Sequence, residues 1–240
     1  MRLSGATVLI TGASSGIGAA TARAMAAAGA RPVLTGRDAE RLAAVAAETG
    51  AASFAADLTG PVEIPEPIDV LVNNAGVGWA GPFEEMAGAD VDRLIAVNLA
   101  APIRLTRALL PGMIERGRGH IVFVASIAGA TGVRHEAVYA ATKAGLICFA
   151  DSLRYEVAGR GIGVSVVVPG VVDTPFFDRR GRPYDRRRPA PIPAERVART
   201  IVTAIERGRA EAYQPGWMRF PARLRGGAPG LFRRLAGRYG

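Results

Sequence analysis

Short runs of β-branched and other apolar residues alternate with longer alanine-rich stretches up to about residue 170. The apolar runs are continuous, as in strands that are buried on both faces of a parallel sheet. They predict strands at Thr7–Ile10, Arg31–Thr35, Ala52–Ala55, Val70–Asn73, Ile121–Ala125 and Val164–Val168. The alanine-rich stretches predict helices at Gly18–Ala28, Ala39–Thr49, Asp90–Arg116 and Val138–Arg160. This alternation indicates an α/β fold in which helices cover both faces of a parallel sheet.

One connection departs from the alternation. Between Ala55 and Val70 the chain holds Pro61, Pro65 and Pro67. Proline removes a backbone donor and disfavours helical geometry in the residue before it, so a regular helix is excluded here. The sequence therefore predicts an extended crossover that leaves one face of the sheet less covered.

The pattern changes again after Pro169-Gly170. Residues 176–193 are rich in Arg and Pro without periodicity, which predicts a loop, and Ala194–Arg207 has the pattern of an amphipathic helix. Residues 208–240 are rich in Arg, Pro and Gly. We therefore expect one domain over residues 1–207, with a long loop at about 171–193, and a basic segment at 208–240 that is not a separate domain.

Composition narrows the class of protein. The chain is 49% hydrophobic, which is ample for a large core. Cys148 is the one cysteine, so an intrachain disulfide is excluded, and His120 and His135 are too few to complete a zinc cluster. The sequence shows no secretory signal and no apolar run near the ~20 residues that span a bilayer. We therefore expect a cytoplasmic protein.

The net charge of +9 is unevenly distributed, because residues 179–240 hold 16 arginines and 4 acidic residues. In the C-terminal segment these cations alternate with apolar residues such as Phe220, Leu224 and Leu231. We first expect this segment to pack over a cleft or at a subunit interface with its arginines solvated. Peripheral contact with an anionic membrane is the second interpretation. No nucleic-acid-binding motif accompanies the charge, so no nucleic acid partner is expected.

A glycine-rich turn follows the first predicted strand and opens a helix. Its sequence is Thr11-Gly12-Ala13-Ser14-Ser15-Gly16-Ile17-Gly18. Glycines let the backbone approach a pyrophosphate closely, and the helix N-terminus offers free N–H groups and partial positive charge. A glycine pattern alone often marks only a turn, but the strand–turn–helix context favours a dinucleotide site. The candidate cofactor-binding residues are Gly12, Ser14, Ser15, Gly16, Ile17 and Gly18.

The end of the second predicted strand bears on which dinucleotide is bound. NAD-binding sites usually place a carboxylate there for the ribose 2′-hydroxyl. This chain has Gly36 followed by Arg37, whose guanidinium can pair with a 2′-phosphate. Asp38 could supply that carboxylate, so NAD(H) stays an alternative. Arg37 could also be a solvated loop cation with no role in binding. We predict that NADP(H) is preferred.

Tyr139 and Lys143 stand four positions apart on one face of a predicted helix. Lys143 is the one lysine among 30 basic residues. A nearby cation favours phenolate and so lowers the pKa of a tyrosine. Ser126 follows a predicted strand, where ligands sit in open α/β sheets, and can hydrogen-bond a substrate oxygen. A Tyr and a Lys that are merely exposed on one helix are the alternative interpretation.

Taken together, the motifs resemble the short-chain dehydrogenase/reductase family. They are Thr11–Gly18, Asn73-Asn74-Ala75-Gly76, Asn98, Ser126, Tyr139-x-x-x-Lys143 and Pro169-Gly170-x-x-x-Thr174, in order over about residues 5–207. The resemblance implies a single Rossmann domain that is doubly wound and binds NAD(P). The chain departs from the family pattern in two places, the proline-bearing crossover and the basic C-terminal segment.

The resemblance also implies a role for each matching residue. Tyr139 would be the general acid/base, Lys143 its pKa-lowering partner and a ribose ligand, Ser126 the donor to the substrate oxygen, and Asn98 the holder of a water that relays protons to Lys143. The cofactor-binding residues would be completed by Asp57 and Leu58 at the adenine, Asn74, Ala75 and Gly76 at the adjoining ribose, and Pro169, Gly170, Val172 and Thr174 at the nicotinamide carboxamide.

Function follows as an expectation. The chain would transfer a hydride between the nicotinamide and a carbonyl or alcohol substrate. Trp79, Phe176, Phe177 and Tyr184 suggest an apolar substrate pocket, with the loop at 171–193 as the substrate loop. The family suggests a homodimer or homotetramer joined through helices around 98–116 and 138–160. A catalytically silent dinucleotide-binding sensor or scaffold, at a membrane surface or elsewhere, is the alternative function.

Overall fold

Seven strands of the computed structural model form a parallel sheet with the order β3-β2-β1-β4-β5-β6-β9, and two short strands, β7 (Val172–Asp173) and β8 (Ile192–Pro193), pair separately. The described residues are 1–64, 67–185 and 189–239. The strands of the seven-stranded sheet are β1 (Thr7–Thr11), β2 (Arg31–Gly36), β3 (Ala52–Ala55), β4 (Val70–Asn73), β5 (Gly119–Val124), β6 (Ile162–Pro169) and β9 (Glu211–Gln214). The strand order reverses direction between β1 and β4. In sheets of this kind, ligands bind at the carboxyl ends of the strands near the reversal.

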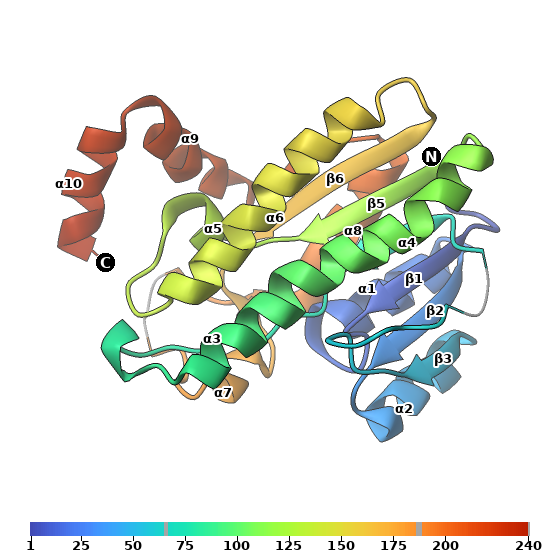
Figure 1. Ribbon diagram of the computed structural model, residues 1–240, viewed down its shortest axis with the longest axis horizontal. Helices are drawn as coiled ribbons and strands as arrows, with labels where there is room; N and C mark the ends of the chain where they lie inside the picture. Colours follow the sequence, from blue (N-terminus) through green and yellow to red (C-terminus); the bar gives the residue numbers. More distant parts are fainter. Residues whose placement is uncertain (65–66, 186–188, 240) are drawn as a thin grey trace.

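Helices cover both faces of the sheet (Figure 1). The apolar sides of α1 (Gly16–Ala27), α2 (Ala39–Thr49) and α8 (Ala194–Glu206) pack into one core cluster. Those of α4 (Ala101–Glu115) and α6 (Ala137–Glu156) pack into the cluster on the other face. The predicted doubly wound Rossmann fold with a parallel sheet is therefore confirmed.

The crossover between β3 and β4 contains no helix among its described residues, as its prolines predict. Leu58 and Ile68 are buried there, and Val62 and Ile64 are partly buried against the same core cluster as α4 and α6. Apolar side chains of the extended segment therefore cover the part of the face where a helix is missing.

The long helix predicted over residues 90–116 is a continuous run of three segments. They are α3 (Gly88–Ile95), a π-helical segment (Ala96–Ala100) and α4. By length and composition alone, Gly88–Glu115 is apolar enough to cross a membrane, a test that core helices of globular proteins also pass. Leu105 and Met113 of α4 belong to the core cluster on this face of the sheet, and 33% of the apolar window is buried in the fold.

The chain holds more regular structure than its sequence pattern predicts, most of it in the last third. The additional elements are α5 (Ile127–Thr131), β7 (Val172–Asp173), α7 (Phe176–Arg179), β8 (Ile192–Pro193), α9 (Arg219–Gly227), α10 (Pro229–Tyr239) and the short 3₁₀ turns Phe83–Glu85 and Gly216–Met218. β9 pairs with β6 as the edge strand of the main sheet. The domain boundary predicted at residue 207 is therefore corrected, because the sheet continues to Gln214. Glu211-Ala212-Tyr213-Gln214 has no β-branched run that would have signalled a strand.

His120 is a buried structural residue of β5, with 2% of its surface exposed. Its Nε2 lies 2.8 Å from Ser165 Oγ, and Ser165 Oγ donates to the carbonyl oxygen of Arg209 at 2.6 Å. The Ser165 proton is thus used, so His120 Nε2–H donates to Ser165. Burial lowers the pKa of His120 to about 4, because desolvation disfavours the imidazolium.

This shift predicts a pH dependence of stability. As pH falls from 6.5, the usual His pKa, towards 4, the unfolded chain gains a proton at His120 that the folded chain does not bind. Over that range we expect the free energy of unfolding of the wild type to fall about 3 kcal/mol more than that of His120→Gln. Urea denaturation of both proteins at several pH values measures the difference. Parallel pH profiles for the two proteins would contradict it.

Candidate active site

The carboxyl ends of β1, β4, β5 and β6 meet at one edge of the sheet, because these four strands are parallel neighbours. Each strand end carries residues that the sequence singles out. They are residues 12–18 after β1, residues 74–76 after β4, Ser126 after β5 and residues 169–174 at the end of β6. The fold therefore gathers motifs that lie far apart in the sequence.

The glycine-rich turn is packed tightly against itself. Gly12 and Gly16 adopt left-handed backbone angles, with φ of 66° and 55°. A Cβ atom on Gly18 would lie 2.2 Å from the carbonyl oxygen of Gly12. Ser15 is the N-cap of α1, and its side chain makes no capping hydrogen bond to the helix. The cradle that a Cβ would fill and the helix N-terminus together fit the pyrophosphate of a dinucleotide.

Side-chain hydrogen bonds join this turn to the end of β4. Thr11 Oγ1 accepts from the backbone N–H groups of Asn74 and Ala75, each at 3.0 Å. Asn74 Nδ2 donates to the Thr11 carbonyl at 2.9 Å. A Cβ on Gly12 would lie 2.8 Å from Ala75 Cα. The residues predicted at the adenine-side ribose thus lie directly against the turn predicted at the pyrophosphate.

Lys143 extends from α6 into the interior, and 4% of its surface is exposed. Its Nζ donates to the carbonyl oxygen of Val124 at 2.9 Å and lies 5.9 Å from the centre of the Tyr139 ring. Burial lowers the pKa of Lys143 to about 8. A Cβ on Gly76 would lie 3.4 Å from Nζ, so Gly76 brings the chain after β4 against the ammonium.

Asn98 lies in the π-helical segment, fully buried. Its Oδ1 accepts from Val77 N at 2.8 Å, and its Nδ2 donates to Val77 O at 2.9 Å and to Thr142 Oγ1 at 3.3 Å. The side chain therefore joins the loop after β4 to α6, one residue before Lys143. A water held by Asn98 stays a prediction.

Tyr139 and Ser126 face each other beside the ammonium. The Tyr139 side chain is mostly buried, and its pKa is raised above the usual value. Burial is the main cause, the Ser126 hydroxyl opposes it by hydrogen bonding to the phenol, Glu136 raises the pKa further, and Arg180 lowers it. The sequence-based expectation of a pKa lowered by Lys143 is therefore wrong for this structure, since desolvation outweighs the other contributions.

The segment after β6 returns to the glycine-rich turn. A Cβ on Gly16 would lie 2.9 Å from Thr174 Cγ2, so Thr174 sits directly over the start of α1. Thr174 Oγ1 is 3.5 Å from Val172 O and accepts from Phe176 N at 3.4 Å. Gly170 N donates to Gln214 O at 2.8 Å, which attaches this segment, next to Pro169, to the edge strand β9.

At the end of β2, Arg37 is exposed next to Gly36. Asp38 is engaged elsewhere as the N-cap of α2: its Oδ1 accepts from Arg41 N at 3.0 Å and its Oδ2 lies 3.2 Å from Arg41 Nε. Asp57 Oδ1 accepts from Thr59 N at 3.0 Å, a bond that lowers the Asp57 pKa, and Arg37 contributes to the same shift.

Two functional candidates without a specific sequence signal are Arg179, the last residue of α7, and Arg180, its C-cap. Arg179 Nη1 donates to Ser15 Oγ at 3.3 Å, which places a cation on the glycine-rich turn. Arg180 is 9% exposed and pairs with Glu136, three residues before Tyr139. Only the run of basic residues after Phe176-Phe177 could have pointed to them.

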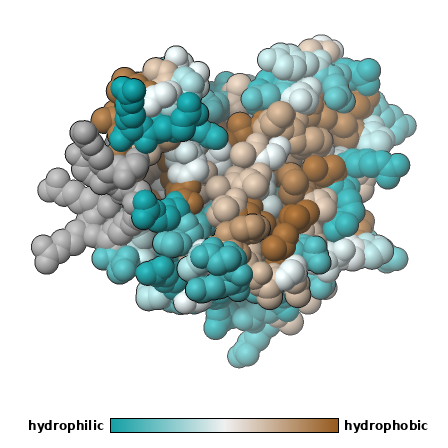
Figure 2. Space-filling view, turned by 60° about the vertical axis from the view of Figure 1, so that its left-hand side comes forward, coloured by the Kyte–Doolittle hydropathy of each residue, from teal (hydrophilic) through white to brown (hydrophobic). Residues whose placement is uncertain are grey.

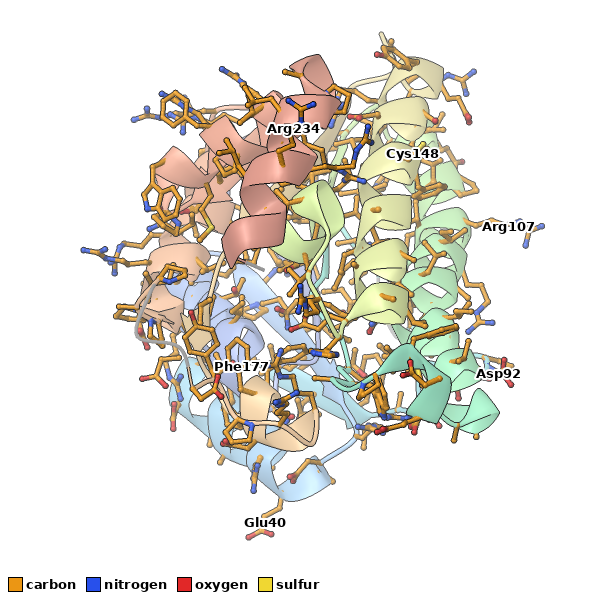
Figure 3. All side chains as sticks on the ribbon, turned by 90° about the vertical axis from the view of Figure 1, so that its left-hand side faces the viewer. Glu40, Asp92, Arg107, Cys148, Phe177 and Arg234 are labelled. Atoms are coloured by element: carbon orange, nitrogen blue, oxygen red, sulfur yellow. The ribbon has the colours of Figure 1, made fainter. Side chains whose placement is uncertain are left out.

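The predicted substrate aromatics form a connected set around Tyr139. Phe176 lies 5.4 Å from the Tyr139 ring centre and 5.6 Å from that of Phe177, and Phe177 continues to Tyr184 at 5.3 Å (Figure 3). Trp79 packs into the same small apolar cluster as Tyr139. Tyr139 is therefore enclosed on one side by aromatic side chains.

The C-terminal segment reaches the site through α5, whose N-cap is Ser126. Helix α9 packs against α5. Arg225 Nη1 donates to the Ala130 carbonyl at 2.8 Å, at the end of α5, where helix carbonyls lack intrahelical partners. Helix α9 therefore lies against α5, and the packing of the segment over a cleft or at a subunit interface stays a prediction.

The sequence and the fold were compared with known proteins. A family model described as short chain dehydrogenase matches residues 6–185. The ketoacyl reductase HetN of Nostoc sp. is 40% identical over 224 residues, which cover 85% of this chain and 76% of that protein.

Solved structures agree over nearly the whole chain. A short-chain dehydrogenase from Sphingobium yanoikuyae in complex with NADPH superposes with a TM-score of 0.82 at 34% identity, covering 95% of each chain. A short chain dehydrogenase/reductase from Burkholderia phymatum in complex with NAD gives a TM-score of 0.85 at 26% identity, covering 96% of each chain.

The packing of the glycine-rich turn predicts that Gly18 tolerates no side chain. We expect Gly18→Ala to lower the free energy of unfolding by about 1–3 kcal/mol, because the methyl group collides with a backbone carbonyl that cannot move freely. The variant should also lose affinity for a dinucleotide. The matched control is Gly88→Ala, where a Cβ meets nothing within 4 Å. Thermal melts and cofactor titrations measure both effects, and equal behaviour of the two variants would contradict the prediction.

Proposed function

The chain belongs to the short-chain dehydrogenase/reductase family of oxidoreductases, and from that premise we propose that it is an NADP-preferring enzyme acting on a carbonyl or alcohol substrate. The observation that carries the proposal is the grouping of Ser126, Tyr139 and Lys143 in a buried site next to the glycine-rich turn. When bound, NADP(H) supplies or accepts the hydride.

Tyr139 exchanges the proton of the substrate oxygen in this proposal. Its raised pKa keeps the phenol protonated at neutral pH, which suits proton donation during reduction of a ketone or aldehyde. Ser126, whose hydroxyl faces the phenol, steadies the same substrate oxygen with a hydrogen bond. A general acid must lie within hydrogen-bonding distance of the atom it protonates, and the hydrogen bond between Ser126 and Tyr139 keeps the two hydroxyl groups close enough to share one substrate oxygen.

Lys143 supports the acid in two ways. With a pKa of about 8 it is mostly cationic at neutral pH, so it stabilises negative charge that develops on the phenol after proton donation. Its ammonium can also bind the nicotinamide ribose. Asn98 positions the lysine by joining Val77 to Thr142 and is the proposed holder of the relay water.

The cofactor would extend along the strand ends. Its pyrophosphate would lie on the turn from Gly12 to Gly18, where Arg179 adds a positive charge that the turn itself lacks. The adenine would lie by Asp57 and Leu58. The nicotinamide carboxamide would face Thr174, and the backbone at Pro169, Gly170 and Val172.

NADP is the preferred dinucleotide in this proposal, because the two charged groups after β2 differ in availability. Arg37 is exposed, whereas the Asp38 carboxylate already caps α2 and pairs with Arg41. A carboxylate that is engaged in this way is a poorer ligand for a ribose 2′-hydroxyl, and a free guanidinium is a good ligand for a 2′-phosphate.

The substrate is proposed to be apolar, because Trp79, Phe83 and Met86 line a small hollow together with Tyr139, and Phe176 packs against the same apolar cluster. We also propose a cytoplasmic homodimer or homotetramer joined through α4 and α6. These helices lie side by side in Figure 1, and Figure 2 shows hydrophobic residues gathered on the surface. Ile95 before α4 and Tyr155 of α6 are large exposed hydrophobic residues.

The acid role predicts the effect of removing one hydroxyl group. Tyr139→Phe should lower turnover at least ~100-fold while NADPH affinity stays near the wild-type value, because the ring packing is kept and the proton donor is lost. The matched control is Tyr155→Phe, which removes a hydroxyl from a side chain that is 80% exposed. NADPH absorbance with a panel of ketones and aldehydes reports turnover. Wild-type protein that binds NADPH but turns over no substrate would favour the silent sensor instead.

The cofactor preference predicts a selective loss. Arg37→Gln should raise the KM for NADPH ~10-fold or more and leave that for NADH unchanged, because a charge-assisted bond to the 2′-phosphate is removed. Arg107→Gln, an exposed arginine of α4 on another side of the molecule, is the charge-matched control (Figure 3). Wild-type turnover that is as efficient with NADH as with NADPH would overturn the preference.

A further inference from the structure

A second groove lies between α8, the edge strand β9 and the start of α9. Its volume is about 480 Å³, within the range of pockets that hold small organic ligands. The lining residues are Arg196, Arg199, Thr200, Thr203, Arg209, Glu211, Ala212, Tyr213, Gln214, Gly216, Arg219 and Arg223. No residue assigned above to the catalytic or dinucleotide site lines it.

Five arginines face this groove against one carboxylate. Glu211, whose Oε1 accepts from the Tyr213 hydroxyl at 2.7 Å, can offset only one of the five positive charges. Within the described part of the chain, none of the five arginines forms an ion pair. The groove thus concentrates positive charge that the protein itself leaves uncompensated.

The polar face of an amphipathic helix accounts for only part of this concentration. It explains Arg196 and Arg199, which lie one turn apart on the side of α8 opposite its buried residues. Arg209 follows α8, and Arg219 and Arg223 come from α9, so three separate segments bring guanidinium groups to the same hollow. Like charges gathered at a concave surface repel each other and focus a positive potential there.

We propose that this groove binds a phosphate-bearing ligand that carries at least two negative charges. Guanidinium groups match phosphate oxygens in a bidentate manner and are only weakly hydrated, so several of them around one hollow favour phosphate over a single carboxylate. The groove is larger than a lone phosphate needs, which leaves room for the organic part of the ligand. A soluble phosphate ester and a phospholipid headgroup share this chemistry.

Exposed apolar residues near the groove would distinguish the two ligand sources, a soluble phosphate ester and a phospholipid headgroup. Trp217, just before α9, is 53% exposed, and Phe220, in the first turn of α9, is 59% exposed. In α10, Leu231 is 53% exposed and Leu235 is 41% exposed. A headgroup in the groove would bring such side chains near the acyl chains of a bilayer, whereas a soluble ester would not involve them.

The test compares direct binding by three proteins. They are the wild type, the groove variant Arg199→Gln/Arg219→Gln/Arg223→Gln, and the control variant Arg2→Gln/Arg107→Gln/Arg160→Gln, which loses the same charge from exposed sites outside the groove. Each is titrated calorimetrically with inorganic pyrophosphate, and each is co-sedimented with phosphatidylcholine vesicles with and without phosphatidic acid. Circular dichroism and NADPH titration confirm that fold and dinucleotide site are intact.

We expect the groove variant to lose at least ~10-fold in affinity for the phosphate probe while the control variant keeps wild-type affinity. Loss with pyrophosphate alone assigns a soluble ester, and loss on phosphatidic acid vesicles assigns a headgroup. Equal weakening of both variants would show a mere net-charge effect and overturn the proposal. The proposal would also be overturned if the wild type bound neither probe, or if the groove variant bound both probes as tightly as the wild type. Should the groove variant misfold, the Arg→Lys triple at the same positions keeps the charge and must bind more weakly than wild type.

Discussion

Burial of the Lys143 ammonium is the constraint around which the active-site half of the fold is arranged. A cation that is 4% exposed is costly unless polar atoms surround it, and the Val124 carbonyl at the end of β5 supplies one. The neighbouring chain must then approach closely. A Cβ on Gly76 would lie 3.4 Å from Nζ, and a Cβ on Gly129 would lie 2.6 Å from the Lys143 backbone. The end of β5 and the chain after β4 thus meet at this ammonium, and α5 packs closely against the backbone of the same residue.

Lys143 and Tyr139 also show why acidity in this site follows burial more than pairing. Desolvation lowers the pKa of the lysine to about 8 and raises that of the phenol, since in each case the charged form is disfavoured. At neutral pH, burial therefore makes the neutral amine of Lys143 easier to reach. It makes the phenolate of Tyr139 harder to reach. A protonated phenol beside a cation is the state that a proton donor requires, and the electrostatic benefit of the cation appears as the proton leaves.

The parts of the fold that could be predicted are those whose signals are local. Buried parallel strands need continuous apolar runs, and the turn from Gly12 to Gly18 needs glycine at close approaches, so both leave marks in the sequence. β9 leaves none, because it is a four-residue edge strand whose position depends on pairing with β6. Likewise, the contacts of Arg179 with Ser15 and of Arg180 with Glu136 join residues that only the folded loop brings together. The direction of the Tyr139 pKa shift was missed for the same reason, since burial is a property of the whole fold.

The contrast between one lysine and 29 arginines takes on a physical meaning from these positions. Where arginines are used here, long side chains carry donors to distant acceptors or to the surface: Arg225 reaches the end carbonyls of α5, Arg179 reaches Ser15, and five arginines line the groove. A compact ammonium fits between Gly76 and the Val124 carbonyl, and its pKa can fall on burial, which a guanidinium resists. The site therefore requires lysine for its size and its titration, whereas the remaining surface requires only positive charge and directed donors.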